Sequence, residues 1–513
     1  MGTQLLNYYH NHIKRTWKIA FFSTVTIFLL VHLYKITNTL PNHDSYYNVY
    51  VDQDMTRSGR WFLQYACGIS SYFDLDWVIG VLCALWLGLT SVAITELFDI
   101  KNPFVIALIG AVLAACPSTT ETLFFGFTAD GYLLGLFLAA GSACLTCRSG
   151  SWKKNLLGGV CLCLCCGIYQ SCVSFAIVLC ICWLVMELLE GNLDAKAGWK
   201  WFARHVLVYA LSMIAYYVLW KVALLINNEQ PVDYQGIDKL GLGSIRPGTL
   251  VNGAIQSVRN LLFLFVEWNI MEHPITLYGA LNLAFLVCFV GVVIIAVVKS
   301  GILRRPGALV MLIFALAASV PMISIWCFLS DGVQYRPMML HSAVLYYVLA
   351  ILLFDRWVGA KLSTAFGLSV CVMVFNFAVM ANIAYDYLNY CQQKTYYEGS
   401  NIMETIEDTC EKYGSEPEHI AFIGSRRLDV ELPTDGPAGR IHVLAVHLEE
   451  SLMYDHFHIN LYLKHTFDMD FEELPYAQRV ELEAMEQVRQ MPIWPAEGYC
   501  QVVDGVLVVR MGE

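Results

Sequence analysis

Long apolar stretches with almost no charged residue dominate the chain, and stretches of this kind fit the interior of a lipid bilayer. About 20 helical residues are needed to cross the hydrocarbon core. Seven stretches approach this length: 17–36, 77–97, 205–225, 274–298, 307–329, 338–354 and 363–385. Only 15% of the 513 residues are charged, against about 25% in an ordinary soluble protein. The sequence therefore predicts a membrane protein that crosses the bilayer many times.

Four further spans are predicted in a denser region, at 102–116, 130–147, 155–170 and 171–189. Several are short, and a helix of about 15 residues cannot cross roughly 30 Å of hydrocarbon. Their polar connections are therefore expected to lie recessed in a watery, protein-lined cavity. Together these segments predict a mainly α fold, a polytopic transmembrane bundle of eleven spans, with ten or twelve as alternatives.

Lysine and arginine are distributed unevenly between the loops on the two sides of the predicted bundle. Fifteen fall on one side, and eight are spread over the longer loops of the other. Loops rich in these residues face the cytoplasm. The N-terminus is therefore predicted to be cytoplasmic, and an odd number of spans places the C-terminus outside.

The composition changes near residue 390. Residues 390–513 contain 23 Asp or Glu and 9 Lys or Arg, a net charge of −14. Helical periodicity runs through 393–412 and 476–491, apolar strands are predicted at 420–424 and 441–447, and Asp504-Gly505 indicates a hairpin turn. Two domains are predicted: a transmembrane catalytic domain at 1–389 with a long first outer loop at 37–76, and a small soluble extracytoplasmic α/β domain at 390–513.

The eighteen cysteines do not predict a disulfide framework, because fifteen lie in or beside apolar spans. The cluster at 161–166 lacks the polar partners that metal ligands require. We interpret these cysteines as small fillers between helices, and no metal-ligand set is predicted among the site residues. Cys391, Cys410 and Cys500 in the tail remain candidates for one disulfide.

Polar residues that could carry chemistry concentrate on the predicted outer side. The first outer loop is longer than a hairpin requires, and it brings His43, Asp44 and Arg60 close to the membrane plane. Its many aromatic residues suit helices that lie along the membrane interface. Aromatic planes beside carboxylates suit a sugar, and arginines suit a phosphate group.

Other outer segments add to this polar set. Glu121 and Asp130 lie in the second outer connection, near bilayer depth, where ionisable groups are costly and mark a functional path. Asp130 has an alternative role as the cap of the next helix, and both interpretations stay open. Tyr169, Gln170 and Arg336 face the same compartment.

Several of these segments resemble the bacterial glucosyltransferase family of the O-antigen conversion type. The resemblance covers nearly the whole chain and lies in 43–45, 58–61, 127–132, 167–170, 385–398, 421–425 and 502–509. It implies an enzyme of GT-C fold in the bacterial cytoplasmic membrane. The implied donor is a polyprenyl-phosphate-linked sugar, and the implied acceptor is a surface polysaccharide on the outer face; the partners include the lipid bilayer and no nucleic acid.

The resemblance also implies roles for residues. The catalytic acid of that fold lies in the first outer loop, which corresponds to Asp44. From this correspondence we hypothesise an inverting displacement in which Asp44 is the general base. In this hypothesis Arg60 or Arg336 stabilises the departing phosphate, and Glu121 and Asp130 hold sugar hydroxyls or, as the alternative, a divalent cation. No other cofactor is implied. The predicted catalytic residues are Asp44, Arg60, Glu121 and Asp130, and the predicted substrate-binding residues are His43, Tyr169, Gln170 and Arg336.

Two other function classes remain as alternatives. A flippase or another transporter of the cell envelope would need a polar path that reaches the cytoplasmic side. The acids on that side lie at span ends, so the one-sided polarity favours an enzyme. A non-catalytic assembly protein would stay active after the outer-loop carboxylates are replaced.

Overall fold

The computed structural model describes residues 13–50, 54–68, 75–148, 150–232, 246–266, 276–329, 333, 335–414, 417–425 and 452–512. The described residues fall into two compact units. The first, here called the bundle unit, contains the residues up to Asn38 and those of Asp54–Asn382. The second, here called the tail unit, contains Thr39–Gln53 and most of the described chain from Ile383 onward.

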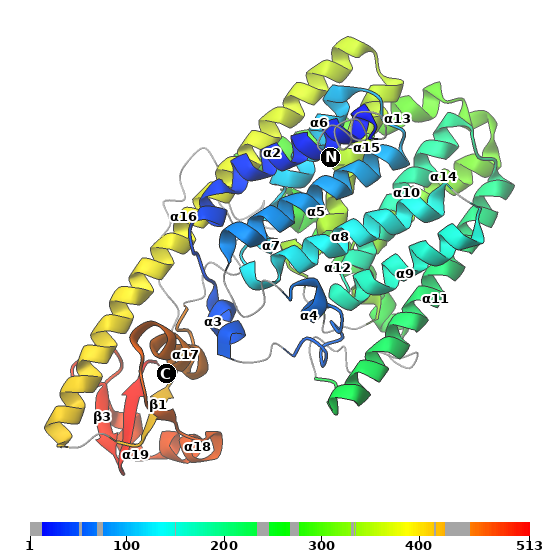
Figure 1. Cartoon of the computed structure of the whole chain (residues 1–513). Coiled ribbons are helices and arrows are strands. Elements are labelled where there is room, and N and C mark those ends of the chain that lie inside the picture. The colour runs from blue at the N-terminus through cyan, green and yellow to red at the C-terminus, as the bar shows by residue number, and fades with distance from the viewer. Residues whose placement is uncertain are drawn as a thin grey trace, which may run out of the picture. The chain divides into compact units, whose positions relative to one another are not determined.

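The bundle unit is built from helices (Figure 1). Each of the eleven predicted spans is helical over most of its length. The helices are α2 (Arg15–Thr37), α4 (Leu63–Ala66), α5 (Asp76–Leu97), α6 (Pro103–Ala115), α7 (Pro117–Thr122), α8 (Gly126–Cys147), α9 (Trp152–Ile168), α10 (Cys172–Glu190), α11 (Ala195–Asn227), α12 (Pro247–Val266), α13 (Leu277–Lys299), α14 (Pro306–Met322), α15 (Val344–Trp357) and the first part of α16 (Ala360–Tyr413). Short 3-10 turns include η3 (Ile325–Phe328) and η4 (Pro337–Met339).

Eight described helices are long and apolar enough to cross a membrane: α2, α5, α8, α10, α11, α12, α13 and α16. Helices α6 and α14 are apolar but shorter. The mainly helical, membrane-embedded character is therefore confirmed, whereas the number of eleven spans stays a prediction. The helices differ widely in burial: 83% of the apolar window of α10 is buried, against only 17% of that of α11.

Helix α12 was not among the predicted spans, and its pattern explains why. Its inward face carries small or polar residues, including Gly253, Ser257 and Asn260, which are buried or packed against η3. Its exposed face carries Leu250, Val251, Ile255, Val258 and Leu262. Small residues allow close backbone approach between helices, and lipid accepts the apolar side chains. The amphipathic pattern is thus the reverse of that of a soluble helix.

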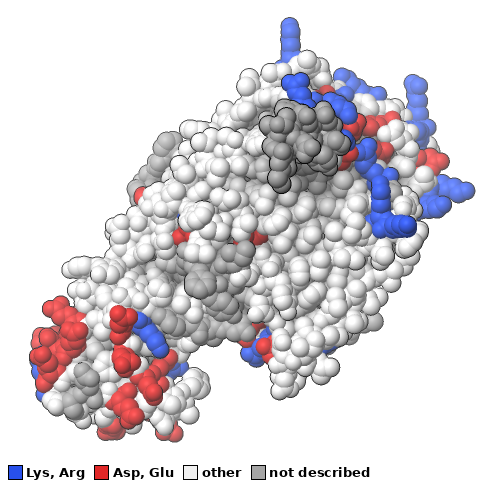
Figure 2. Space-filling view, in the orientation of Figure 1, with Lys and Arg blue, Asp and Glu red and all other residues white. Residues whose placement is uncertain are grey.

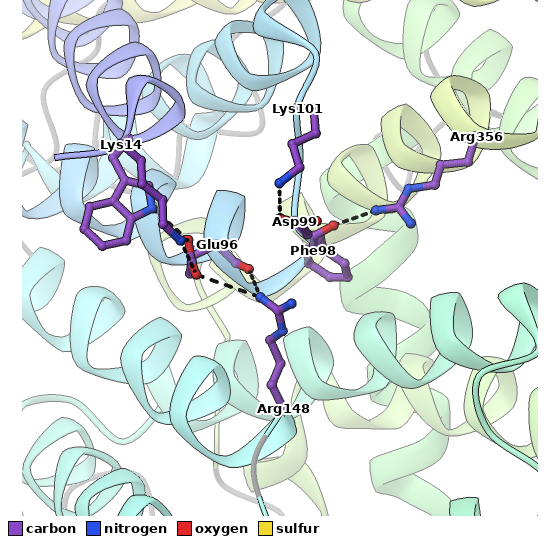
Figure 3. A network of polar contacts seen from close by, with 8 residues as sticks. Lys14, Glu96, Phe98, Asp99, Lys101, Arg148 and Arg356 are labelled. Atoms are coloured by element: carbon purple, nitrogen blue, oxygen red, sulfur yellow. Dashed lines mark hydrogen bonds and ion pairs between the residues drawn. The ribbon is translucent and has the colours of Figure 1, made fainter. Parts of the chain in front are cut away.

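Charged side chains gather at the end of the bundle unit where α5, α10 and α15 end (Figure 2). Figure 3 shows their pairing: Lys14 Nζ lies 2.8 Å from Glu96, Lys101 Nζ lies 2.6 Å from Asp99, and Arg148 donates 2.7 Å to the Glu96 carbonyl. The sequence assigned these cations to one side, and the structure confirms that they share one end of the bundle. The assignment of this end to the cytoplasm stays a prediction.

The tail unit contains a four-stranded sheet of order β2-β1-β4-β3. Strand β1 (His419–Ile423) is parallel to β2 (Glu472–Glu473) and β4 (Val506–Arg510), and β3 (Cys500–Val503) is antiparallel to β4. The predicted first strand and hairpin are confirmed, and Asp504 and Gly505 adopt positive φ angles of 48° and 80°. The strand predicted at 441–447 lies outside the described residues.

Helices cover this sheet in a way that the sequence predicted only in part. The periodicity at 476–491 forms two helices, α18 (Tyr476–Ala484) and α19 (Glu486–Gln490), because Met485 is extended between them. Helix α17 (His456–Phe467) was not predicted. Helix α16 runs through position 390, so the change in composition there is not a break in the helix. None of the eighteen cysteines, all of which the structure describes, forms a disulfide, so the candidate disulfide in the tail is wrong.

Candidate functional site

The segment Ser58-Gly59-Arg60-Trp61 forms a turn whose carbonyl groups accept hydrogen bonds from side chains of other segments. Gly59 has a φ of 84°, which favours glycine. Gln170 Nε2 donates 3.0 Å to the Ser58 carbonyl, and Tyr216 Oη donates 3.0 Å to the Gly59 carbonyl. Two elements distant in sequence therefore fix this turn: the α9–α10 connection and α11.

This turn places Arg60 against a pair of stacked tyrosines. Arg60 Nη1 donates 3.1 Å to Tyr132 Oη, and its Nε donates 2.9 Å to Ser58 Oγ. The rings of Tyr132 and Tyr169 stack, with centroids 4.3 Å apart and planes at 20°. Both of these acceptors are neutral oxygen atoms, and the two contacts orient the guanidinium. The structure thus brings together Arg60, Tyr169 and Gln170, three of the predicted site residues.

The Ser58–Trp61 turn also packs tightly on α9, where the Trp61 ring lies against Gly167. A Cβ atom at Gly167 would lie 2.8 Å from Cε2 of the rigid Trp61 ring. We expect Gly167→Ala to lower the free energy of unfolding by about 1–3 kcal/mol, because the ring must move. Thermal unfolding of the purified protein in detergent measures this. Gly141→Ala is the matched control, since nothing lies within 4 Å of its added Cβ. Equal unfolding temperatures for the two variants would contradict the close contact.

Asp130 lies inside α8, which begins at Gly126 with Phe125 as its N-cap residue. The alternative in which Asp130 caps this helix is therefore wrong. The side chain is buried and interacts electrostatically with the Cys83 thiol, as does Lys35. Lys35, which is buried, in turn forms an ion pair with the half-buried Asp76, with 2.7 Å between Nζ and Oδ1. Burying charged groups costs free energy, so residues of this kind are expected to have a role in structure or function.

Glu121 is buried in α7, a short helix between α6 and α8 that lies outside the spanning segments. Its Oε2 accepts a 2.6 Å hydrogen bond from the backbone N–H of Met338, and Arg336 acts on it electrostatically. Burial raises the pKa of the Glu121 carboxyl to about 8, although the Met338 N–H and Arg336 act in the opposite direction. A carboxyl of this kind can exchange a proton near neutral pH. Glu121 and Arg336 are thus brought together.

His43 and Asp44 belong to the tail unit, in helix α3 (His43–Tyr50). His43 Nε2 lies 3.5 Å from Asp44 Oδ1. The His43 ring meets the rings of Tyr454 and His458 edge-on, each at 5.7 Å. The tyrosines of α3, which the sequence placed at the membrane interface, include Tyr46, whose ring packs on α17.

The tail supplies a carboxylate–imidazole pair that the sequence did not indicate as functional. Asp455 Oδ1 lies 2.7 Å from Nδ1 of His458. Burial would raise the pKa of the Asp455 carboxyl, but the His458 ring and backbone N–H hold it below its usual range. Sequence reasoning missed this pair and also Tyr216, which holds the Ser58–Trp61 turn together with Gln170, because nothing in the local pattern distinguishes Tyr216 from a packing residue.

A polar cavity of about 450 Å³ opens at the charge-rich end of the bundle unit. Its lining includes four acids (Asp99, Glu187, Glu190, Asp355) and three bases (Lys101, Arg148, Arg356). Several of these are paired with one another, as in the contact of Arg356 with Glu190. The acidic excess does not suit an anionic phosphate, which needs uncompensated cationic donors.

Comparison with known proteins identifies one family. A family model described as Glucosyl transferase GtrII matches residues 33–354. This range contains all eight predicted site residues. The tail segments whose likeness to the family was noted, at 385–398, 421–425 and 502–509, lie beyond the match, and their resemblance stays a prediction. No curated protein and no solved structure matches the chain.

Proposed function

The chain belongs to the glucosyl transferase GtrII family, and from this premise we propose that it transfers glucose from a polyprenyl-phosphate carrier to a cell-surface glycan on the outer face of the bacterial cytoplasmic membrane. Family membership by itself makes the chain a glycosyltransferase of cell-envelope glycans. The donor, the acceptor, the GT-C architecture and the orientation are parts of the proposal.

The assembly of Arg60, Tyr132 and Tyr169 is the observation that carries the proposal. It combines an oriented cation for a phosphate with an aromatic pair on which a sugar ring can stack. The surrounding helices are apolar enough to lie in lipid, where a polyprenyl tail is also soluble. A lipid-linked sugar phosphate satisfies all of these features at once.

In the proposed reaction, Asp44 accepts the proton of an acceptor hydroxyl while the hydroxyl oxygen attacks the anomeric carbon. The bond from that carbon to the phosphate oxygen breaks, and the polyprenyl phosphate leaves as an anion. Arg60 stabilises this anion, and Arg336 is the second candidate for that role. His43 positions Asp44, and the ring of His43 in turn contacts His458 of the Asp455–His458 pair within the same unit.

Glu121 and Asp130 are proposed to hold hydroxyl groups of the sugar. A divalent cation between them was the alternative. Both acids are buried, and we propose that they form hydrogen bonds with these hydroxyl groups. Addition of a chelator should leave the transfer rate unchanged.

The direct test is reconstitution of the purified protein in proteoliposomes with polyprenyl-phosphate glucose and a surface polysaccharide, followed by mass analysis of the glycan. Addition of one hexose is expected, with loss of glucose from the carrier. If donor lipid crosses the bilayer and no polyprenyl-phosphate hexose supports transfer, the chain is a transporter and the proposal is wrong.

Tyr132→Phe tests how Arg60 is oriented. The substitution removes the hydroxyl that accepts from Arg60 and keeps the ring that stacks on Tyr169. A hydrogen bond from a charged group contributes about 1.5–3 kcal/mol, so we expect the transfer rate to fall about 10- to 100-fold. Initial rates in proteoliposomes measure the effect. An unchanged rate would show that Arg60 does not depend on this contact.

A further inference from the structure

Two cysteines and a histidine from three helices meet inside the bundle unit. Cys147 is the last residue of α8, Cys180 lies within α10, and His205 lies in α11. The two Sγ atoms are 3.4 Å apart, and one ligand atom from each side chain lies within 4.8 Å of the others. All three residues are buried, with exposed fractions of 3%, 4% and 6%. From the sequence, the cysteines were interpreted as fillers between helices. The group could not be recognised there, because its three members come from three separate helices.

The histidine is held in the form that a metal ligand requires. Its Nδ1 lies 2.9 Å from the Trp201 carbonyl, which can only accept a hydrogen bond. The proton of a neutral imidazole is therefore on Nδ1, and Nε2 carries a lone pair. Nε2 is buried and makes no hydrogen bond within the described part of the chain. Metal-bound histidines are oriented by this same contact of the second ring nitrogen.

We propose that Cys147, Cys180 and His205 bind one thiophilic d10 cation, Zn²⁺ or Cu⁺. Two sulfur ligands and one imidazole suit such ions. Zn–S distances of about 2.3 Å and Zn–N distances of about 2.0 Å place neighbouring ligand atoms about 3.5–4 Å apart, close to the spacing observed. Both thiols release their protons to water when the ion binds, so the ion is held by two thiolates and a neutral imidazole.

Charge and surroundings favour Zn²⁺ of the two ions. Two thiolates and one Zn²⁺ form a neutral centre, which suits a site shielded from water, whereas Cu⁺ leaves one negative charge. The hydroxyl of Tyr209 lies 3.1 Å from Cys180 Sγ and can donate a hydrogen bond to that sulfur once it is a thiolate. Arg148, the residue after Cys147, reaches the charge-rich end of the bundle, so an ion can enter from there. The bound ion would join the three helices that supply its ligands.

The experiment measures metal bound to the full-length protein in detergent, after removal of weakly bound ions. Separate samples are loaded with Zn²⁺, Cu⁺ or Co²⁺. The expected result is one equivalent of Zn²⁺ per chain and, with Co²⁺, a thiolate-to-cobalt charge-transfer band in the near ultraviolet. Cys147→Ser and His205→Gln should weaken binding at least tenfold. One equivalent of Cu⁺ without retention of Zn²⁺ would support the site and assign it to the other ion.

The matched control is the double substitution of Cys165 and Cys172 by serine, since these buried thiols also interact but have no such histidine. It should leave metal binding unchanged. Equal loss of metal in control and test variants would overturn the proposal, as would a disulfide between Cys147 and Cys180 in the isolated protein. If the variants fail to fold, the cobalt spectrum of the wild type decides, because absence of the thiolate band would exclude the site.

Discussion

Replacing Asp44 with asparagine is expected to lower the rate of hexose transfer about 100- to 10,000-fold while the protein still inserts and folds. The amide has nearly the shape of the carboxylate but cannot accept the proton of the acceptor hydroxyl. The Asp44 side chain is 38% exposed, and asparagine keeps an oxygen atom in the position that lies next to His43. Its exposure also allows a glycan hydroxyl to reach it.

The measurement is the initial rate in proteoliposomes, normalised to the amount of inserted protein. Asp470→Asn is the matched control, since it removes an exposed carboxylate from the same unit and should leave the rate within about twofold. Retention of more than about a tenth of the wild-type rate by Asp44→Asn would remove Asp44 from the role of general base.

Replacing Arg60 is expected to have the second-largest effect. Arg60→Gln should lower the rate about 100- to 1,000-fold, because the phosphate that leaves loses its cation. Arg60→Lys keeps the charge but cannot reproduce both contacts of the planar guanidinium, to Tyr132 and Ser58. Its rate should therefore lie between those of Arg60→Gln and the wild type.

The two substitutions at Arg60 separate charge from shape. Rates should be compared at saturating donor, so that a change in donor affinity alone does not lower them. Equal and nearly normal rates for both variants would transfer the role of phosphate stabiliser to Arg336. If a higher donor concentration fully restores the transfer rate, Arg60 stabilises the bound donor and the transition state equally.

Sequence patterns were sufficient wherever the determining interaction is local or comes from the bilayer. Apolar length predicted the helices, because lipid imposes it on each segment separately. The hairpin at Asp504 and Gly505 was predicted because two positive φ angles demand such residues. Lys14, Lys101 and Arg148 were assigned to one side because Lys and Arg accumulate in cytoplasmic loops, a rule that applies to each loop separately.

The rest depends on contacts between segments that no local pattern reveals. The pairing of Arg60 with Tyr132 joins residues 72 positions apart, and that of Gln170 with the Ser58 carbonyl joins residues 112 apart. The packing of α3 on α17 is of the same kind. Motifs thus indicated several members of the candidate site, but the side chains that hold them in place required the fold.

The reversed pattern of α12 has a consequence for how the protein is made. Its main partners, α13, α14 and η3, all follow it in the chain. At about 5–20 residues per second, the roughly 60 residues that separate α12 from η3 take on the order of 3–12 s to synthesise. During this time the small and polar residues of α12 that pack on η3 lack that native partner. A factor that shields this face from lipid would therefore act in a brief window of translation, before Asn260 can reach Ser324.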